Sequence, residues 1–257
     1  MRPLLGKSGR PVVVTGAGHG LGRGIALTLA KRRSIVFGTA SSAREVEDLR
    51  SASSGRVSLI VCDIANTEMV NAWAAGVSEA IGGSGLDLLI NTTVRLPRGP
   101  LELLPLEEVR RGFEASVFGG LAVINAFLPA LRRAHGRVVQ ISTLVQDEPH
   151  PFNGPSDASR AAIEAFSAAY RAELKPFGID VVIAAMSDRE AAAPGSAMGV
   201  TGLDGSMTAA HRKLYGKLLR IWTKKLSDDD ETRDYNDAAV RVVDLAVQDK
   251  VPGKAKI

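Results

Sequence analysis

The chain has 257 residues, of which 45% are hydrophobic and 23% are charged. That length suits one large α/β domain or two small ones, and the apolar fraction excludes an intrinsically disordered chain. The single cysteine, Cys62, excludes a disulfide scaffold and fits a reducing compartment. With 32 Lys+Arg against 28 Asp+Glu, the formal net charge of +4 is too small for a nucleic-acid binder.

The expected elements alternate between strands and helices along the chain. Runs of Val, Ile and Leu predict strands at Val12–Thr15, Ser34–Thr39, Val57–Cys62, Leu86–Asn91, Arg137–Ile141 and Asp180–Ala185. Helices are expected near 21–32, 43–52, 67–81, 106–133 and 156–176, and Ser42 and Glu45 have the spacing of a capping box. Strands that are apolar throughout are typical of a parallel sheet covered on both faces. The predicted fold class is therefore α/β, one doubly wound parallel sheet (Rossmann fold) in a single domain over residues 1–257.

Two observations concern the compartment. Residues 1–10 carry charges where a signal peptide has its apolar core. The longest charge-free run, residues 115–131, is short for a membrane span and fits a helix buried between protein layers. We therefore expect a cytoplasmic protein with no membrane span.

Residues 15–22, with the sequence Thr-Gly-Ala-Gly-His-Gly-Leu-Gly, follow the first expected strand and open the first helix. Glycines permit a tight turn and a close approach of the backbone to a pyrophosphate, and the helix N-terminus supplies unpaired N–H groups and the positive end of its dipole. Strand, loop and helix in this order predict a dinucleotide site, and a merely structural turn is the alternative.

This loop resembles the Thr-Gly-x-x-x-Gly-x-Gly motif of the short-chain dehydrogenase/reductase family, and the resemblance extends over nearly the whole chain. Asp63 is similar to the family's adenine-contacting Asp, and Asn91 matches one Asn of its Asn-Asn-Ala-Gly segment. Residues 151–155 and Ala158-Ser159 are similar to the hydroxysteroid and retinol dehydrogenase branch. The family implies strand order 3-2-1-4-5-6-7, a nicotinamide cofactor, and a homodimer or homotetramer built on the helices at 106–133 and 156–176. It implies no metal site. The cofactor contacts that it implies are Gly16, Gly18, His19, Gly20, Leu21, Gly22, Ser41, Asp63, Ile64, Asn91, Thr93 and Arg160.

The chain departs from this family at all four catalytic positions. The family uses a Tyr-x-x-x-Lys pair, a Ser thirteen residues before the Tyr, and an Asn on the preceding helix. The resemblance puts Ser156 at the tyrosine, Arg160 at the lysine, Thr143 at the serine and Ser116 at the asparagine. Ser156 is the most serious change, because a phenol titrates near a pKa of about 10 whereas an aliphatic alcohol has no accessible ionisation near neutral pH. The alternative interpretations make Ser156 a helix N-cap and Arg160 a solvated helix charge.

Other residues are candidates for a replacement proton donor. His150 lies near Asp147 and Glu148 in the segment that borders the substrate in the family, and Tyr215 lies on the segment expected to cover the site. Tyr170 is nearly four turns beyond Ser156 on the same helix, so we expect it in the core or in an interface.

The second strand ends without an acid that would hold the ribose hydroxyls of NAD. His19, Ser41, Ser42 and Arg44 are instead suited to the 2′-phosphate of NADP. We therefore expect NADP as the cofactor, with NAD as the alternative.

Residues 187–236 have no place in the strand–helix alternation and are predicted to form a lid over the substrate. A helix near 209–226 carries a basic stripe of Lys213, Lys217, Arg220 and Lys224, opposite an apolar side of Leu214, Tyr215, Leu218, Leu219, Trp222 and Leu226. Such a helix suits a membrane surface or an anionic ligand, but a solvated face over a core-facing one is favoured. In the family this region closes over the substrate, so its apolar face implies an apolar small molecule.

Three functions fit these observations. The first is an NADP(H)-binding protein of this family that is non-redox or atypical because the proton relay is missing. The second is an NADP-dependent oxidoreductase that acts on an apolar carbonyl or alcohol through a non-standard donor. The third is a non-catalytic subunit of an oligomer. The four substitutions favour the first, whereas the intact glycine loop, Asp63 and Asn91 support the second.

Overall fold

The computed structural model describes residues 9–92, 96–143, 151–186, 207–228 and 235–257. Within them, parallel strands form one seven-stranded sheet in the order β3-β2-β1-β4-β5-β6-β7, as the family resemblance implied. The strands are β1 (Pro11–Val14), β2 (Ile35–Ala40), β3 (Val57–Val61), β4 (Leu88–Asn91), β5 (Arg137–Thr143), β6 (Asp180–Met186) and β7 (Lys254–Lys256). The six strands expected from apolar runs are present, with ends shifted by up to two residues. The strand β7 is short and polar, so its residues gave no such signal.

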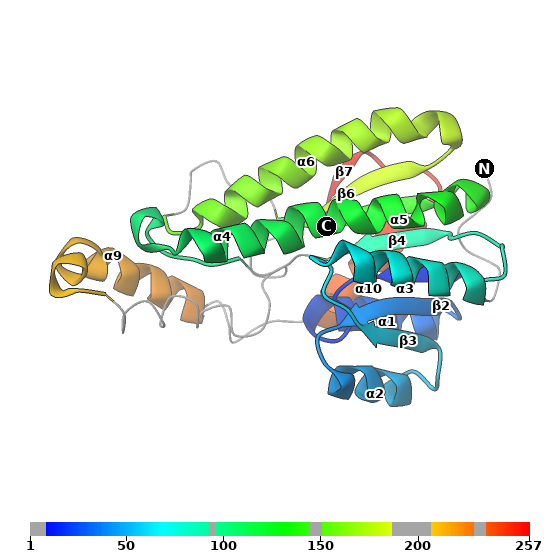
Figure 1. Ribbon diagram of the computed structural model, residues 1–257, viewed down its shortest axis with the longest axis horizontal. Helices are drawn as coiled ribbons and strands as arrows, with labels where there is room; N and C mark the ends of the chain where they lie inside the picture. Colours follow the sequence, from blue (N-terminus) through cyan, green and yellow to red (C-terminus); the bar gives the residue numbers. More distant parts are fainter. Residues whose placement is uncertain (1–8, 93–95, 144–150, 187–206, 229–234) are drawn as a thin grey trace.

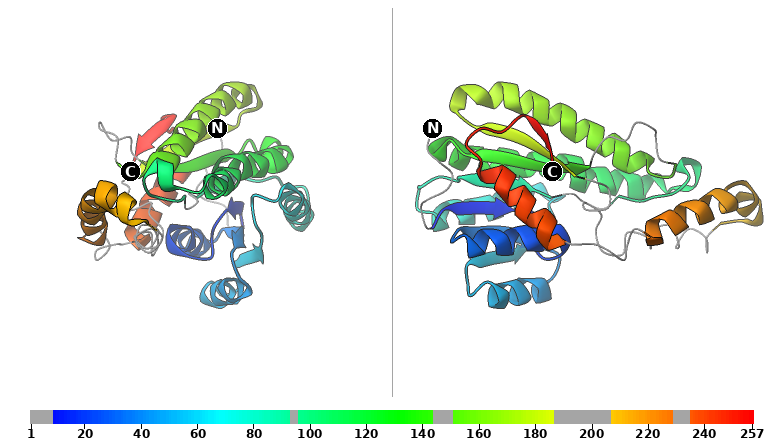
Figure 2. Two further views of the ribbon diagram at one scale, coloured as in Figure 1. Left: turned by 60° about the vertical axis from the view of Figure 1, so that its left-hand side comes forward. Right: turned by 180° about the vertical axis from the view of Figure 1, so that it is seen from behind.

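Helices cover both faces of the sheet (Figure 1, Figure 2). They are α1 (Gly20–Lys31), α2 (Ala43–Ala52), α3 (Thr67–Ala80), α4 (Leu106–Phe113), α5 (Gly119–Ala134), α6 (Gly154–Leu174), α9 (Ala209–Asp228) and α10 (Tyr235–Val247). One core cluster joins α1 and α10 to the sheet through fully buried side chains such as Ile25 and Val242. A second joins α3 and α5 to the other face, where Trp73 packs edge-on against Phe127 with ring centroids 5.0 Å apart. Because both faces are covered, the strands carry apolar residues on both sides.

The long helix expected at 106–133 is three segments, because a π-helical turn (Glu114–Phe118) separates α4 from α5. By length and composition, Leu106–Ala134 could cross a membrane. Ile124, Phe127 and Leu131 are however buried in the core cluster beneath the sheet. The charge-free run thus packs one side against the sheet, with 44% of the apolar window buried, and its placement between two protein layers stays a prediction.

The strand order reverses between β1 and β4, which is where open α/β sheets form a crevice at their carboxyl ends. The loop after β1 and the N-terminus of α1 lie at this edge, and α6 begins beside it at Gly154. Helix α9 extends away from the body of the molecule at the end where α4 and α6 begin (Figure 1).

Candidate dinucleotide and ligand site

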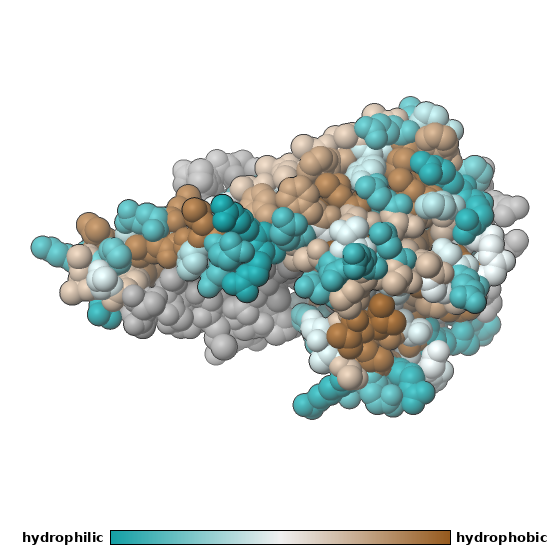
Figure 3. All heavy atoms as spheres, viewed as in Figure 1, coloured by the Kyte–Doolittle hydropathy of each residue, from teal (hydrophilic) through white to brown (hydrophobic). Residues whose placement is uncertain are grey.

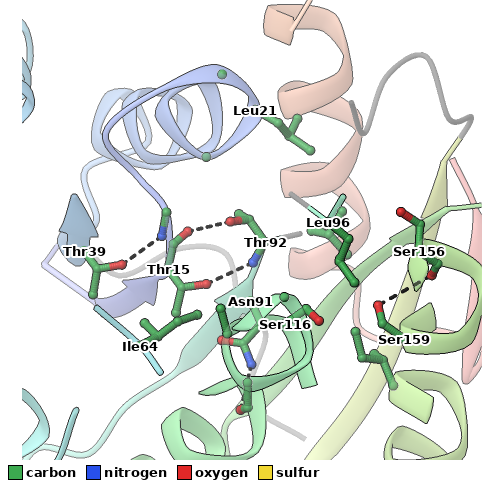
Figure 4. Close-up of a pocket in the computed structure, with 18 of the residues that line it drawn as sticks. Thr15, Leu21, Thr39, Ile64, Asn91, Thr92, Leu96, Ser116, Ser156 and Ser159 are labelled. Atoms are coloured by element: carbon green, nitrogen blue, oxygen red, sulfur yellow. Dashed lines mark hydrogen bonds between the residues drawn. The ribbon is translucent and has the colours of Figure 1, made fainter. Parts of the chain in front are cut away.

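A pocket of about 1050 Å³ lies at the carboxyl ends of β1, β2, β3, β4 and β5. Its lining runs from Thr39 and Ser41, at and just after the end of β2, to Ser156 and Arg160 on α6. Figure 4 shows Thr15, Thr39 and Thr92 on one side and Ser156 and Ser159 on the other, with Leu96 between them. The pocket is as large as the upper end of typical ligand sites, so it can hold an extended ligand together with a second, smaller one.

Three threonines hold the glycine loop in place, as the dashed lines in Figure 4 show. The Thr15 hydroxyl accepts the N–H of Thr92 at 3.0 Å, and the Thr92 hydroxyl donates to the carbonyl oxygen of Thr15 at 2.9 Å. The Thr39 hydroxyl accepts the N–H of Gly16 at 2.9 Å. These bonds tie the loop to the ends of β2 and β4, so the N-terminus of α1 has a fixed direction. The sequence did not predict these hydrogen bonds, because a hydroxyl's partners follow from the tertiary fold.

Two glycines of the loop are required because neighbouring atoms leave no room for a Cβ. Gly16 has a φ of +59°, and a Cβ there would lie 2.6 Å from the Thr92 hydroxyl. A Cβ on Gly22 would overlap the carbonyl group of Gly16. Gly16, His19, Gly20, Leu21 and Gly22 line the pocket, whereas Gly18 does not. The turn is therefore compact and leaves the first N–H groups of α1 facing the pocket, which fits a pyrophosphate.

Glu45 on α2 lies outside the described lining of the pocket but contacts two lining residues beside β2, Ser41 and His19, so an acid absent from the end of the second strand is supplied by the next helix. Its Oε2 accepts the N–H of Ser41 at 2.8 Å, and its Oε1 lies 3.2 Å from Nδ1 of His19. The expected capping box is therefore shifted, because the Ser42 hydroxyl accepts the N–H of Glu45 but the carboxylate returns to Ser41. Arg44 is 91% exposed, lies 3.9 Å from Asp48, and is outside the described lining of the pocket.

Of the residues expected to contact the middle of the cofactor, all that the structure describes line the pocket. Asp63, Ile64 and Asn91 line the pocket. The Asn91 amide donates to the carbonyl oxygen of Gly120 at 3.2 Å, and Asp63 accepts the N–H of Ala65 at 3.0 Å. Thr93 lies outside the described residues. Next to Asp63, burial and the carboxylate raise the pKa of the Cys62 thiol, which is therefore no activated nucleophile.

The four residues that the family resemblance assigned to the catalytic positions, Ser116, Thr143, Ser156 and Arg160, all line this pocket. Ser116 lies in the π-helical turn, and Thr143 is the last residue of β5. π-helical turns occur frequently at functional sites, because the extra residue redirects a side chain. The fold thus brings together residues that lie far apart in the sequence.

Ser156 is not a helix N-cap, contrary to that alternative. Helix α6 begins at Gly154 with Asn153 at the N-cap position, so Ser156 is the third helical residue. Its backbone carbonyl is 3.5 Å from the hydroxyl of Ser159, and its side chain is half-buried at the pocket. Gly154 and Pro155 extend the helix N-terminally, since Pro is favoured in the first helical turn.

Arg160 is not a solvated charge either. Its side chain is only 16% exposed, and it contacts Asp157 at 3.4 Å and Glu164 at 3.8 Å. Both carboxylates lie on α6, so the guanidinium is held along this helix. Its Nε is buried without a hydrogen-bond partner. A buried guanidinium nitrogen without a partner indicates that this group faces a ligand or water.

Further unpaired polar atoms gather in the same pocket. Within the described residues, side chains of the lining that bury such an atom are Asn91, Ser116, Gln140, Asn153 and Arg160. Leaving a buried polar atom unpaired costs about 1–3 kcal/mol, so such atoms are retained where a ligand or water pairs them. Of these residues, Gln140 and Asn153 were not expected from the sequence.

The candidate replacement donors do not all reach the pocket. Tyr215 lies outside the described lining, and a hydrogen bond with Glu102 raises the pKa of its hydroxyl. Tyr170 donates to Asn125 at 2.8 Å and packs beside the second core cluster, as expected of a core or interface residue. Asp147, Glu148 and His150 lie outside the described residues.

Tyr235 is the one tyrosine in the described lining, and the sequence analysis missed it. It is the first residue of α10, and its carbonyl oxygen lies close to α1, 3.0 Å from where a Cβ on Gly24 would be. Tyr235 therefore enters the pocket from the side of α1 and the glycine loop. The sequence around Tyr235 contains no motif that would distinguish a pocket residue from a core residue.

An apolar cluster anchors α9 next to the pocket. Met207, Leu219 and Trp222 are buried and pack with Leu103, Phe152 and Tyr215. The Phe152 ring lies edge-on to Trp222, with centroids 5.9 Å apart. Leu103 and Phe152 immediately precede the pocket residues Leu104 and Asn153. Of the residues predicted as a lid, 187–206 and 229–234 lie outside the described parts.

A parallel sheet with a glycine loop, a helix N-terminus and a long pocket at its switch point defines a dinucleotide-binding Rossmann protein. The family model of the short chain dehydrogenases matches residues 10–191, and the chain belongs to this family.

Curated relatives give the same assignment. The chain is 34% identical to human retinol dehydrogenase 16 over 173 residues, which is 67% of this chain and 54% of the relative. It is 33% identical to mouse estradiol 17-beta-dehydrogenase 2 over 183 residues, 70% of this chain and 48% of the relative. The chain therefore spans about half the length of these relatives.

The fold is shared with a metagenomic short-chain oxidoreductase whose crystal structure contains NADP. The TM-score is 0.74 at 21% identity, and the superposition covers 99% of this chain and 98% of the other. At this identity the likeness supports the fold.

Proposed function

We propose that this chain is a nicotinamide-dinucleotide-binding short-chain dehydrogenase/reductase that has lost the family's usual proton relay. The observation that carries the proposal is that Ser156 and Arg160, which the resemblance assigns to the family's Tyr and Lys, both line the pocket. The glycine loop, by contrast, keeps glycines at Gly16 and Gly22, where a Cβ would overlap neighbouring atoms, as a loop that approaches a pyrophosphate requires. A non-redox or atypical role follows if the end of the pocket at the glycine loop (the cofactor end) is intact while the end at Ser156 and Arg160 (the ligand end) is altered.

The chemistry of the altered residues supports this proposal. A nicotinamide cofactor, when bound, supplies or accepts a hydride, and the protein must then move a proton to or from the ligand oxygen. Ser156 has no accessible ionisation near neutral pH, and its side chain is shorter than that of a tyrosine. Arg160 keeps a positive charge that can bind a ribose hydroxyl or an anion, but it does not release a proton. Thr143 and Ser116 retain hydroxyls that can orient a ligand without transferring its proton.

The cofactor end supports binding of NADP(H) only if Glu45 moves. A 2′-phosphate favours His19 and the N–H of Ser41, and the Glu45 carboxylate already occupies both. Glu45 is thus an internal anion at the place that a 2′-phosphate would take, whereas the ribose hydroxyls of NAD(H) can donate to it. We therefore propose that both dinucleotides bind, with the preference set by this carboxylate.

The ligand is proposed to be an apolar small molecule with a polar end. Leu96, Leu104 and Ile163 line the pocket beside the altered relay, and Thr143 and Arg160 supply polar groups there. The names of the relatives, retinol and estradiol dehydrogenases, agree with an apolar ligand class.

A second candidate function is an oxidoreductase with a non-standard donor. The retained Asp63, Asn91 and glycine loop favour it. Tyr235 is the described tyrosine that it can use, although Tyr235 enters from the side of α1.

Binding and turnover measurements separate these functions. Fluorescence titrations with NADH and NADPH should show binding, and a panel of apolar ketones and aldehydes should leave the bound cofactor unoxidised. Robust oxidation of the cofactor, unaffected by Ser156→Ala, would establish the second function and make Tyr235→Phe the next variant. A chain that binds neither dinucleotide would leave the role of a non-catalytic subunit.

A homodimer or homotetramer is part of the proposal, in a protein that we place in the cytoplasm. Phe118 and Phe166, on the π-helical turn and on α6, are 52% and 42% exposed. Large exposed aromatic residues on helices that the family uses for assembly are suited to an interface. Val117 is only 3% exposed, so a charge there would disrupt the protomer and not only an interface.

A further inference from the structure

Helix α9 buries one face and leaves a second apolar row uncovered. Tyr215, Leu219 and Trp222 point into the apolar cluster beside the pocket. Leu214, Leu218 and Ile221 are 65%, 50% and 52% exposed. Their spacing of four and three residues places them in one row along the helix, next to the buried face. The expectation that Leu214 and Leu218 lie on the buried side of this helix is wrong, because the buried side is narrower than the apolar pattern predicts.

A basic row lies on the other flank of this apolar row. Lys213, Lys217 and Arg220 are exposed and follow the same spacing, continued by Lys224 one turn later. Going around the helix, the order is therefore buried face, exposed apolar row, basic row. Figure 3 shows apolar and hydrophilic surface lying side by side over α9, at the left of the view.

The basic surplus of the whole chain comes from this helix. Residues 209–228 contain six Lys+Arg and one acid, whereas the rest of the chain contains 26 Lys+Arg and 27 Asp+Glu. A solvated helix needs neither this concentration of charge nor three uncovered aliphatic side chains. An apolar row beside a row of Lys and Arg matches an anionic bilayer surface, where aliphatic groups enter the acyl boundary and cations contact headgroups.

We propose that α9 docks this protein on the surface of an anionic phospholipid bilayer. The apolar row inserts at the interface, and Lys213, Lys217 and Arg220 lie at the phosphate level. The buried face stays on the protein, because Trp222 and Phe152 hold it there. Since Leu103 and Phe152 adjoin the pocket residues Leu104 and Asn153, docking places the ligand end of the pocket near the membrane. This inference goes beyond the proposed function and does not depend on any turnover.

Vesicle flotation tests the proposal with two phospholipid compositions. The full chain should float with vesicles of phosphatidylcholine containing about 30% phosphatidylserine at about 50 mM salt, and not with pure phosphatidylcholine. Replacing Lys213, Lys217 and Arg220 with Gln should lower the partition coefficient on the order of 100-fold. A matched control replaces Lys31, Arg133 and Lys250, which are exposed on other elements, with Gln and should float like the parent chain.

Three outcomes would overturn the proposal. Equal loss of flotation in the control and the α9 variant would show a net-charge effect without a docking surface. The variant with Leu214, Leu218 and Ile221 replaced by Ser should also lose flotation while NADH binding is kept. If it instead changes the mass measured by light scattering without vesicles, α9 covers a second copy of the chain. Failure of the parent chain to float with the anionic vesicles refutes membrane docking directly, whatever the cofactor titrations show.

Discussion

The two ends of the pocket differ in how much of their chemistry is built into the backbone. At the glycine loop, Gly16 and Gly22 allow close backbone contacts, and binding groups are main-chain N–H groups at the start of α1. At the other end, Ser116, Ser156 and Arg160 line the pocket, and we expect its chemistry there to depend on side chains. Under the proposed function, cofactor binding and proton transfer depend on different parts of the chain, so a substitution can affect one without the other.

The largest expected effect comes from restoring the ligand end. Ser156→Tyr with Arg160→Lys and Ser116→Asn should raise the rate of carbonyl reduction by about 10²–10⁴-fold, the contribution of a positioned general acid. The rate is measured as oxidation of NADPH or NADH with a panel of apolar carbonyls. The variant carrying Arg160→Lys and Ser116→Asn alone is the control and should stay at the parent rate. An equal rise in the control would assign proton transfer to a residue other than Tyr at position 156.

Gly22→Val should disrupt the cofactor end. Its side chain overlaps the carbonyl of Gly16, so dinucleotide affinity should fall by more than about 100-fold, equivalent to about 2.7 kcal/mol. Gly76→Val is the matched control, because Gly76 is also in a helix and a Cβ there meets nothing within 4 Å. Fluorescence titration measures both variants. Parent-like binding by Gly22→Val would mean that the dinucleotide does not lie against this loop.

Arg160→Ala tests the group that lies between the two ends. A buried guanidinium that hydrogen-bonds a cofactor ribose contributes about 1.5–3 kcal/mol, so dinucleotide affinity should fall by about 10- to 100-fold. Arg50→Ala, which removes an exposed guanidinium paired with Glu47, should bind like the parent chain. Unchanged affinity in Arg160→Ala would confine this arginine to its contacts with Asp157 and Glu164.

The smallest expected effect concerns the choice between dinucleotides. Glu45→Gln keeps an acceptor for the N–H of Ser41 but removes the charge that opposes a 2′-phosphate. The ratio of NADPH to NADH affinity should rise about tenfold, since two unit charges 4 Å apart interact by about 1 kcal/mol even in water and a phosphate carries more than one charge. Glu47→Gln, on the exposed side of α2, should leave the ratio unchanged. A ratio unaltered by Glu45→Gln would show that this carboxylate moves aside without cost.

Much of the fold was predictable because Val, Ile and Leu runs and glycine spacing act locally. The family resemblance supplied the strand order, and it placed Ser116, Thr143, Ser156 and Arg160 in one pocket. Other features depend on contacts between distant segments. Glu45 reaches Ser41 and His19 only because α2 starts beside the loop, and Tyr235 arrives from the C-terminal helix α10.

The sequence pattern also did not predict where α6 begins or which side of α9 is buried. Ser156 was assigned as a possible cap because Ser favours that position, yet Gly154 and Pro155 precede it in the helix. On α9, the apolar residues fit one continuous face, and the structure divides them into a buried row and an exposed one.

The π-helical turn (Glu114–Phe118) amounts to one residue inserted into an otherwise regular helix. Each residue advances an α-helix by about 100°, so this insertion sets the rotation of α4 about its axis relative to α5. Glu108 and Arg111 on α4 line the pocket, while Phe127 and Leu131 on α5 remain in the core. Deleting Ala115 would allow a regular helix and rotate Glu108 and Arg111 away from the pocket. The turn therefore works as a phase shift, which lets one long helical segment pack into the core along α5 and line the pocket along α4.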